Sequence, residues 1–383
     1  MPFTKFKKLF SLKFKYGFPK KNDIMIYDDN RSKFIKRYLK NHSTYFNRFQ
    51  SSSYLYLPIL FKCIFNLNLN FSDYKKFFIE YVNPKVIITS NDNQLGFFRT
   101  KKLFPKIKFV AIQGFWKFDL DHDIMFNRSF YKKKDLNCDF FLCYNKFVAS
   151  EYKRFINCKN FISIGSFESN FFPINKKKNF NKKIIFISQF KNQEDDVHWH
   201  KNYNLGEWKK EEIKFLYNIK EFIPLKEKIT VIGKSSSFKE KNYYKKIFGN
   251  KLIFIKNDRL NISRKKKIFK YLDKSELIIT LDSSLGYEAL ARGNKVIFFS
   301  IRNNLDKDTR SRLRFCWPNK KSSYGLNWTN LNNKKEIKRL FQVRKMKQKK
   351  WNDFFNKEFK DICVHDEKNK QFLKLLSKIK AKV

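Results

Sequence analysis

The stretch LIITLDSSLGYEALARGNKVIFFS, from Leu277 to Ser300, predicts a strand, a polar turn, a short helix and a second strand. Its first five residues are apolar or β-branched, as in a strand that a parallel sheet buries on both faces. Asp282, Ser283 and Ser284 then supply turn and N-cap chemistry. The stretch therefore indicates an α/β unit in which a helix begins where a parallel strand ends.

The start of this helix is a candidate nucleotide site. Its N–H groups and dipole favour an anion such as phosphate, and Gly286 would let the backbone come close to the ligand. Glu288, expected in the first turn, can accept hydrogen bonds from the two vicinal hydroxyls of a ribose. The alternative is a plain N-cap at Ser283 or Ser284 and a plain dipole partner at Glu288. Neither serine stands three residues before Glu288, so a capping box does not account for it.

Charge and composition narrow the class of protein. The 383 residues carry a formal net charge of +49, and 42% are hydrophobic, as expected for a globular chain with more than one core. Lysine is spread over the whole length, and no DNA- or RNA-binding signature is present. We therefore expect anionic partners such as donor phosphates and lipid headgroups, and we do not predict nucleic acid as a partner.

The N-terminal residues 1–20 are basic and amphipathic. No run of apolar residues is long enough for a transmembrane helix, and lysines interrupt every short one, so a secretory signal is not predicted. Five phenylalanines fall on one helical stripe with lysines around it: Phe3, Phe6, Phe10, Phe14 and Phe18. This pattern predicts a helix lying on a membrane surface or, alternatively, packed on its own domain.

After Pro19 the sequence alternates between strand and helix patterns in two series. We predict two Rossmann-like parallel-sheet domains facing a cleft, an acceptor-side domain over residues 21–178 and a donor domain over residues 179–333. A basic helical tail is expected over residues 334–383. The strands predicted in order are Asp23–Tyr27, Lys85–Ser90, Ile107–Gln113, Asp139–Tyr144, Phe161–Ile164, Ile184–Gln189, Ile229–Gly233, Leu252–Ile255, Leu277–Leu281 and Val296–Ser300. The helices predicted in the first domain are Ser32–Leu39, Tyr54–Phe65 and Tyr74–Tyr81.

Ligands of open α/β sheets bind outside the carboxyl ends of the strands, so the polar residues after each strand are the candidate site residues. Polar residues are expected in any loop, but glycine is scarce here and still recurs near strand ends. On the acceptor side the candidates are Asp29, Asn91, Asp92, Asn93, Gln113 and Gly114; on the donor side they are Lys234, Ser283, Ser284, Gly286 and Glu288.

The sequence resembles bacterial GT-B glycosyltransferases that build capsule and other surface polysaccharides, including Kdo-transferase-like and polysialyltransferase-like enzymes. SSLGYEALARGNKVIFFS matches their S-x-x-G-x-E-A-x-x-x-G-x-x-V block, and weaker matches begin at Val86, Phe109, Ile162 and Lys183. The resemblance implies a nucleotide-sugar donor, with Ser283, Ser284 and Gly286 at its phosphate and Glu288 at its ribose. It favours CMP-linked acidic sugars. The family's Q-N-G is replaced by Gln113-Gly114-Phe115-Trp116, so the acceptor surface is expected to differ.

The expected reaction is transfer of a hexosyl or acidic sugar from a nucleotide-sugar donor to a surface-polysaccharide or lipid-linked acceptor. The helix start, with Lys234 nearby, can hold the leaving phosphate without a metal, and no cofactor is predicted. Asp92 is the first choice for the general base and Asp29 the second, with an Asx-turn or N-cap as the structural alternative for each. His198 and His200 lack further ligands, so no metal site is predicted there, although either histidine could cover the donor.

We expect the protein in the cytoplasm, peripheral on the inner face of the membrane, where lipid-linked acceptors reside. Three other functions remain open. A polyanion- or nucleic-acid-binding protein would bind in a steeply salt-dependent way without nucleotide preference. A nucleotide-sugar epimerase or hydrolase would turn over the donor without an acceptor. A polyol-phosphate transferase would share the fold.

Overall fold

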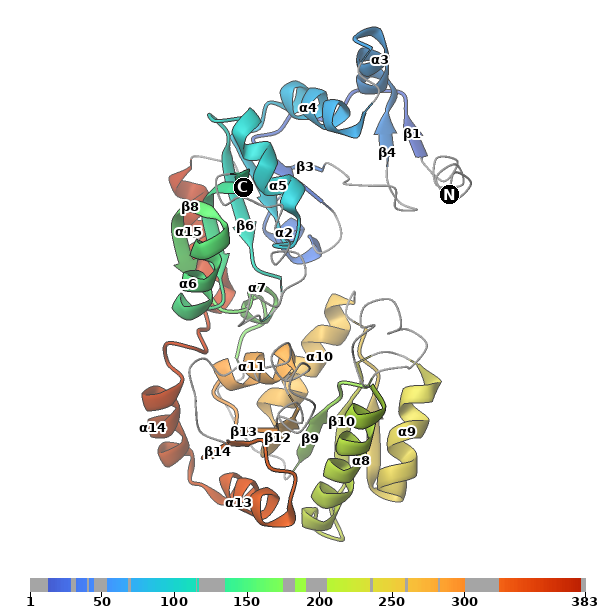
Figure 1. The fold of residues 1–383 in the computed structure, drawn as a ribbon, viewed down its shortest axis with the longest axis vertical. Helices are drawn as coiled ribbons and strands as arrows, with labels where there is room; N and C mark the ends of the chain where they lie inside the picture. Colours follow the sequence, from blue (N-terminus) through green and yellow to red (C-terminus); the bar gives the residue numbers. More distant parts are fainter. Residues whose placement is uncertain are drawn as a thin grey trace. The chain divides into compact units, whose positions relative to one another are not determined.

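The computed structural model describes residues 13–28, 32–39, 41–44, 54–67, 70–114, 116, 135–174, 183–190, 205–234, 237–258, 261–281, 283–299 and 324–379. They fall into two compact units. The first takes its residues from 1–114, 128–168 and 369–383, and the second from 115–127 and 169–368. Both units are mixed α/β structures built on a parallel sheet (Figure 1).

The first unit contains a six-stranded parallel sheet in the order β3-β2-β5-β6-β7-β8. Its strands are β2 (Ile24–Ile26), β3 (Ser43–Thr44), β5 (Val86–Thr89), β6 (Lys108–Ile112), β7 (Asn137–Cys143) and β8 (Asn157–Ser163). The strand order reverses between β2 and β5, which makes their carboxyl ends the switch point of this sheet. All four residues of β5 are buried, as expected of a strand covered on both faces.

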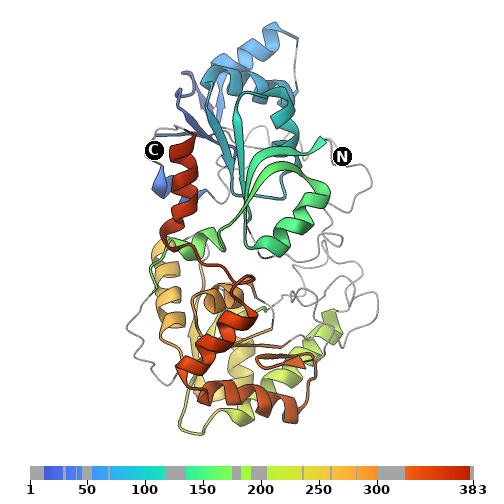
Figure 2. The same cartoon turned by 90° about the vertical axis from the view of Figure 1, so that its left-hand side faces the viewer.

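Helices connect these strands, and a helix from the end of the chain joins them. They are α2 (Lys33–Tyr38), α3 (Leu57–Phe65), α4 (Phe71–Val82), α5 (Leu95–Thr100), α6 (Lys146–Phe155), α7 (Phe167–Asn170) and α15 (Lys370–Lys378), with a 3₁₀ turn η1 (Lys101–Leu103). Phe372 of α15 contacts the rings of Tyr38 and Phe167, and the Asn369 side chain donates to Tyr38 Oη and to the Phe167 carbonyl. The C-terminal helix therefore packs with the first unit (Figure 2).

The second unit contains a seven-stranded sheet in the order β11-β10-β9-β12-β13-β15-β14, parallel except for β14. Its strands are β9 (Ile184–Ile187), β10 (Ile229–Ile232), β11 (Leu252–Ile255), β12 (Leu277–Thr280), β13 (Val296–Phe299), β14 (Tyr324–Gly325) and β15 (Trp328–Thr329). Reading β9 as the first strand, the parallel order is 3-2-1-4-5-6, the order of dinucleotide-binding Rossmann sheets. The switch point lies between β9 and β12, which pair in register from Leu277 opposite Ile184 to Thr280 opposite Ile187.

Amphipathic helices accompany the strands of this sheet (Figure 1). They are α8 (Leu205–Phe222), α9 (Phe238–Phe248), α10 (Ile262–Asp273), α11 (Ser284–Ala291), α13 (Lys334–Lys345) and α14 (Gln348–Glu358), with 3₁₀ turns η3 (Gly249–Lys251) and η5 (Glu367–Asn369). Side-chain caps begin several of them: Ser237 accepts from the Glu240 N–H, Asn261 from Arg264 and Asn333 from Glu336.

Each strand predicted from the sequence is present within one to four residues of its predicted bounds. The helix predicted for the N-terminal segment does not extend over residues 13–15. Lys13–Lys15 form strand β1, which pairs in parallel with β4 (Tyr54–Tyr56), where a helix start was expected. Alternating Lys-Phe-Lys and Tyr-Leu-Tyr side chains suit a strand pair, and this tertiary pairing overrides the helical spacing of the phenylalanines. Residues 1–12 lie outside the described part of the chain.

No helix among the described residues is long and apolar enough to cross a bilayer.

Candidate functional site

The carboxyl ends of β9 and β12 position helix α11 at the switch point of the second sheet. β12 is entirely buried and ends at Thr280, whose Oγ1 accepts a hydrogen bond from the Ser283 N–H at 3.2 Å. This bond turns the chain out of the strand, and α11 begins at Ser284. The helix start therefore lies where an α/β sheet of this strand order binds its ligand.

The first turn of α11 keeps a partly exposed polar face. Ser283 is the N-cap, and its Oγ accepts from the Leu285 N–H at 3.4 Å, close to the upper limit for a hydrogen bond. Ser283 and Ser284 are both partly exposed. The N-cap alternative is thus present at Ser283, while Ser284, the first residue of the helix, is partly exposed. This arrangement can hold an anion.

Glu288 is partly exposed and lies one turn further along the helix than the sequence indicated. Because α11 begins at Ser284, Glu288 is its fifth residue and lies beyond the first turn. Residues four apart share a helix face, so Ser284 and Glu288 stand one above the other. A phosphate at the helix start and a diol at Glu288 would therefore lie along one face of α11.

Gly286 has a packing role that the sequence did not indicate. It is buried against the sheet, and a Cβ atom there would lie 2.6 Å from Thr280 Cγ2 and 3.3 Å from Phe298 Cε1. Glycine is needed here because α11 packs closely on β12 and β13, and its role at a ligand stays a prediction. By this packing, Gly286 helps to set the position of α11 on the sheet.

An aromatic stack covers the buried side of α11. Trp116 lies parallel to the ring of Tyr287, with centroids 4.5 Å apart, and Tyr287 packs in turn on Phe298 at 4.7 Å. Trp116 belongs to the second unit although it stands only two residues after Gly114 of the first unit. The sequence marked Trp116 only as a departure from a family motif, and its contact with α11 has no local sequence signal.

A buried polar network supports Lys234 at the end of β10. The Glu240 carboxylate, fully buried, accepts from the Lys234 N–H at 2.7 Å and from Ser188 Oγ at 2.5 Å. Tyr244 Oη lies 2.8 Å from the same serine oxygen, and burial, together with the charge of Glu212, raises the pKa of Tyr244 well above its ordinary value. The network holds the backbone of Lys234, whose side chain is partly exposed.

Arg292 anchors the far end of α11 and was not predicted. Its guanidinium binds both oxygens of Asp273, from Nε to Oδ1 at 2.8 Å and from Nη2 to Oδ2 at 2.6 Å. It also donates to the carbonyls of Ser169, Phe172 and Pro173. The arginine side chain is fully buried, so this fork joins α11, α10 and residues 169–173 of the second unit.

Asp92, the first choice for a general base, is fully buried in the first unit. Its Oδ1 accepts from the Gly114 N–H at 2.9 Å, and its Oδ2 accepts from the Tyr152 hydroxyl. Both carboxylate oxygens thus bind distant parts of the first unit, a structural role other than the Asx-turn or N-cap considered as the alternative.

The other acceptor-side candidates divide into buried and partly exposed groups. Gln113 is buried and its Oε1 accepts from the Tyr144 N–H at 2.9 Å. Asn91 and Asn93 are partly exposed, and the Asn91 side chain accepts from the Asn93 N–H at 3.3 Å, as in an Asx-turn. The structure brings Asp92 and Gly114 into contact, as expected of neighbouring strand ends.

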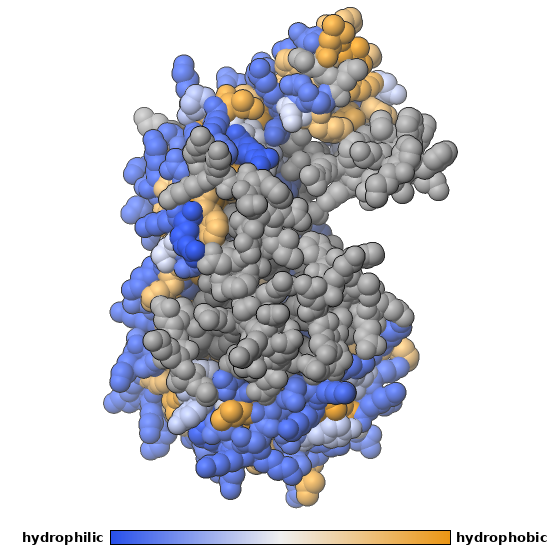
Figure 3. Space-filling model, in the orientation of Figure 1, coloured by the Kyte–Doolittle hydropathy of each residue, from blue (hydrophilic) through white to orange (hydrophobic). Residues whose placement is uncertain are grey.

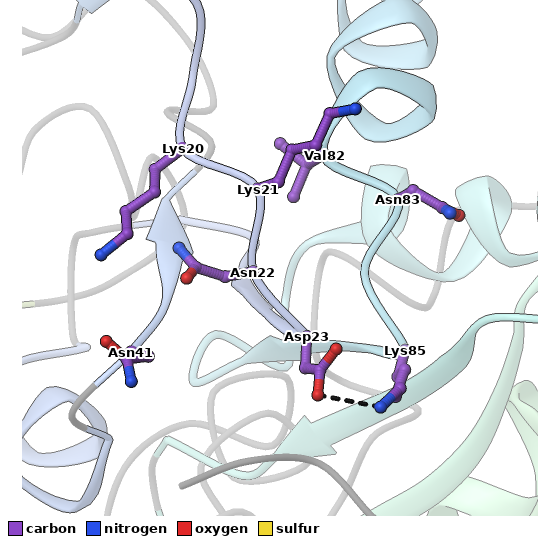
Figure 4. A pocket seen from close by; sticks show the side chains of 8 residues that line it. All are labelled: Lys20, Lys21, Asn22, Asp23, Asn41, Val82, Asn83 and Lys85. Carbon is purple, nitrogen blue, oxygen red and sulfur yellow. Dashed lines mark hydrogen bonds and ion pairs between the residues drawn. The ribbon is translucent and has the colours of Figure 1, made fainter.

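An open pocket of about 580 Å³ lies at the opposite edge of the first sheet, beside the amino ends of β2 and β5. Figure 4 shows the Asp23 carboxylate paired with the Lys85 ammonium at 2.9 Å, while Lys20 and Lys21 extend away from this pair. The lining residues are Lys20, Lys21, Asn22, Asp23, Asn41, Val82, Asn83 and Lys85. No sequence motif indicated this pocket.

Among the residues that the structure describes, no group of three or more His, Cys, Asp and Glu is arranged to hold a metal ion. Asp29, His198 and His200 lie outside the described residues.

Several solved structures share the fold. A "putative UDP-N-acetylglucosamine 2-epimerase" from Listeria monocytogenes matches with a TM-score of 0.53 at 10% identity, over 94% of this chain and 97% of the other. The UDP-bound MnaA of S. aureus matches with 0.51 at 12% identity, over 94% and 97%. The wall teichoic acid polymerase TagF soaked with CDPG matches with 0.50 at 13% identity, over 94% and 90%. These likenesses confirm the predicted α/β fold of GT-B type.

The sequence itself has no match among curated proteins. A protein family described as "putative O-antigen biosynthesis protein" matches residues 110–380, which include all of α11, the Arg292 anchor and the Glu240 network. The match spans more than half of the chain, and so this protein belongs to that O-antigen biosynthesis family.

Proposed function

We propose that the protein is a glycosyltransferase that moves a sugar from a nucleotide-linked donor onto a growing surface polysaccharide. The observation that carries this proposal is the partly exposed face of α11 at the β9–β12 switch point. Ser283 and Ser284 would bind the donor phosphate at the helix start, and Glu288 would bind the ribose hydroxyls. Membership of an O-antigen biosynthesis family supports a polysaccharide product.

The same face suits the chemistry of a departing nucleotide. Negative charge grows on the leaving phosphate as the glycosidic bond breaks, and a fixed helix start stabilises that charge without rearranging. The partly exposed Lys234, its backbone held by Glu240, would add a positive charge. Because these groups supply the electrostatic help, the proposed reaction is independent of a metal.

The donor and acceptor classes follow from chemistry and resemblance. A strongly basic protein suits anionic ligands, so a CMP-linked acidic sugar is our first choice of donor. A lipid-linked glycan at the inner face of the membrane is the proposed acceptor. We assign no general base, because both oxygens of Asp92 are engaged inside the first unit.

A nucleotide-sugar epimerase is the second candidate, since proteins of that name share this fold. The two reactions separate in one assay. An epimerase converts the nucleotide sugar without an acceptor, whereas a transferase releases nucleotide only when a glycan acceptor is added.

The experiment that tests the donor site is thermal unfolding with CMP, CDP, UDP, GDP and ADP, with Glu288→Ala beside the parent. All six tryptophans lie in residues assigned to the second unit, so tryptophan fluorescence follows the unit that holds α11. A nucleotide at ~100 times its dissociation constant should stabilise the unit by roughly 2.7 kcal/mol. Glu221→Ala is the control, because it removes the same charge from an exposed position of α8.

We expect one nucleotide to raise the midpoint in the parent and in Glu221→Ala but not in Glu288→Ala. An equal response to all nucleotides, or an equal response in both variants, would mean generic anion binding and would favour the polyanion-binding alternative. The nucleotide response is measured as the shift from each protein's own ligand-free midpoint, so that a stability change caused by the replacement itself is not counted as a lost response.

A further inference from the structure

An apolar surface lies on the first unit, on elements other than the strand ends that carry its acceptor-side candidates. Half-exposed or exposed aromatic and aliphatic side chains gather on β1, on the residues after it, on α3 and on the α3–α4 turn. We call this set the α3 surface: Phe14, Tyr16, Phe18, Phe61, Ile64, Phe65, Leu67 and Phe71. In Figure 3 the hydrophobic colouring concentrates over α3.

Contacts within the first unit bring these segments together. Phe14 on β1 lies opposite Leu55 on β4, and β4 runs directly into α3. Phe18 stacks on Tyr81 of α4 with ring centroids 4.6 Å apart, and α4 packs against α3. The α3 surface is therefore one region of the fold.

Helix α3 displays its apolar residues outward. Its sequence LPILFKCIF has one charged residue, Lys62, yet only Ile59 and Cys63 are buried. At the turn that follows, Phe65 is 84% exposed and Leu67 is 89% exposed. Leu67 also has a φ of 54°, a left-handed backbone that costs a leucine free energy. Apolar side chains held in water in this way indicate an interaction surface.

Lysines predominate around this surface, although Asp73 of α4 lies close enough to α3 to raise the pKa of the Cys63 thiol, after burial as the main cause. Residues 13–22 and 54–71 contain no Asp or Glu, and they carry the lysines at 13, 15, 20, 21 and 62. Two ammonium groups sit over partly exposed rings: Lys15 Nζ is 4.5 Å from the Tyr54 ring centroid, and Lys21 Nζ is 5.0 Å from that of Tyr81. Lys20 and Lys21 also line the open pocket beside Phe18. Apolar side chains among lysines are typical of a surface that meets anionic lipid headgroups.

We propose that the α3 surface docks the protein onto an anionic lipid bilayer. Phe65 and Leu67 at the α3–α4 turn would enter the acyl boundary, and the lysines would meet the phosphates of the headgroups. The region presents a helix end with protruding side chains, which suits a bilayer better than it suits a protein groove. The proposal rests on the proposed function, because it names the surface that would bring the enzyme to a lipid-linked acceptor.

The test is co-sedimentation of the full chain with phosphatidylcholine vesicles, with and without phosphatidylglycerol. The variant is Phe65→Ser with Leu67→Ser, and the control is Phe238→Ser with Leu225→Ser, two residues of the second unit that are 74% and 90% exposed. Both variants remove the same side chains from exposed positions, so neither should lower the stability of the fold appreciably.

We expect the parent and the control to bind phosphatidylglycerol vesicles equally, and the Phe65/Leu67 variant to bind at least about tenfold more weakly. Lys15→Glu combined with Lys62→Glu in the parent should also weaken binding, and this loss should be largest at low salt, because salt screens the attraction between lysines and headgroups. Equal binding of all variants would overturn the proposal, because the spread-out charge of +49 would then suffice. Loss of a dimer in size-exclusion chromatography without vesicles, confined to the Phe65/Leu67 variant, would instead assign the surface to a second copy of the chain.

The nucleotide-induced shift of the unfolding midpoint separates this proposal from the proposed function. It should be the same in the parent and in the Phe65/Leu67 variant without vesicles, because the two sites belong to different units. A lost vesicle response with an intact nucleotide response is the expected pair of results. Intact vesicle binding without any nucleotide-induced shift would contradict the proposed function but not the proposed membrane surface.

Discussion

Asp92 in the first unit and Ser283 in the second hold equivalent places, each three residues after a central strand that ends in threonine. In both turns the threonine Oγ1 accepts a backbone N–H, from Asn91 at 3.1 Å and from Ser283 at 3.2 Å. Beyond that the two turns differ. Asp92 is fully buried and bonded through both oxygens, whereas Ser283 stays partly exposed and caps α11 through one long hydrogen bond.

The difference shows that a polar residue after a parallel strand can serve the fold or the ligand. In the first unit the Asp92 carboxylate joins two neighbouring elements, the residue after β6 and helix α6. In the second unit, the contacts that fix helix α11 lie at its C-terminal end and on its buried side. They involve Arg292, Gly286 and the Trp116–Tyr287 stack. The partly exposed front of α11 is the face on which we propose that the donor binds.

The largest effect is expected for Arg292→Ala, which removes the anchor of α11. It leaves the buried Asp273 carboxylate without its partner and should destabilise the second unit by roughly 3–5 kcal/mol. Urea unfolding followed by tryptophan fluorescence measures this loss. Arg264→Ala is the control, since its exposed pair with Asp258 also lies in the second unit and should contribute less than about 1 kcal/mol. Equal losses of unfolding free energy in the two variants would contradict an anchoring role of Arg292.

Asp92→Ala tests the other half of the comparison. The Gly114 N–H and the Tyr152 hydroxyl would both lose a buried acceptor, so we expect the first unit to lose roughly 2–4 kcal/mol by circular dichroism in urea. The nucleotide-induced midpoint shift should remain. Asp135→Ala is the control, because its pair with Lys102 is exposed. Full stability of Asp92→Ala together with lost sugar transfer would restore the general-base role.

Acid should weaken the second unit through His365. Burial, and next the charge of Arg292, lowers its pKa from 6.5 to about 4, while Glu367 and Asp273 oppose that shift. Because the folded pKa is below the unfolded one, the unfolded state binds the proton first. Stability is complete above about pH 6.5 and should fall by roughly 2 kcal/mol as pH drops towards 4. In His365→Gln this part of the loss should be absent; an identical pH profile would contradict the assignment.

Gly286→Ala should give the smallest loss, roughly 1–2 kcal/mol, because the new Cβ overlaps Thr280 Cγ2. Adding Thr280→Ser removes that methyl group, keeps the Oγ that caps the turn, and should recover most of the loss. Gly17→Ala, where nothing lies within 4 Å, is the neutral control. Thermal midpoints of the four proteins measure the effect. A Gly286→Ala variant with parental stability and no nucleotide response would instead support the predicted role of this glycine at the ligand.

The alternation of helices and strands could be predicted from the sequence because buried parallel strands are continuous apolar runs, such as those of β9, β12 and β13. The start of α11 after a polar turn was readable for the same reason. The N-terminal segment was not, since the phenylalanine spacing suits a helix while the pairing of β1 with β4 requires a strand. A partner strand about 40 residues away leaves no mark on local spacing.

By itself the sequence determined the two α/β series, the strand ends and the helix at Ser284, because each depends on the periodicity and turn chemistry of neighbouring residues. The tertiary structure decided which polar groups are buried and hydrogen-bonded inside the fold. Asp92, Glu240 and Arg292 are buried because their partners come from segments 22 to 123 residues away. Burial and hydrogen bonding between distant segments depend on packing. For this reason, similar turns after a strand give a buried, hydrogen-bonded carboxylate in the first unit and a partly exposed helix start in the second.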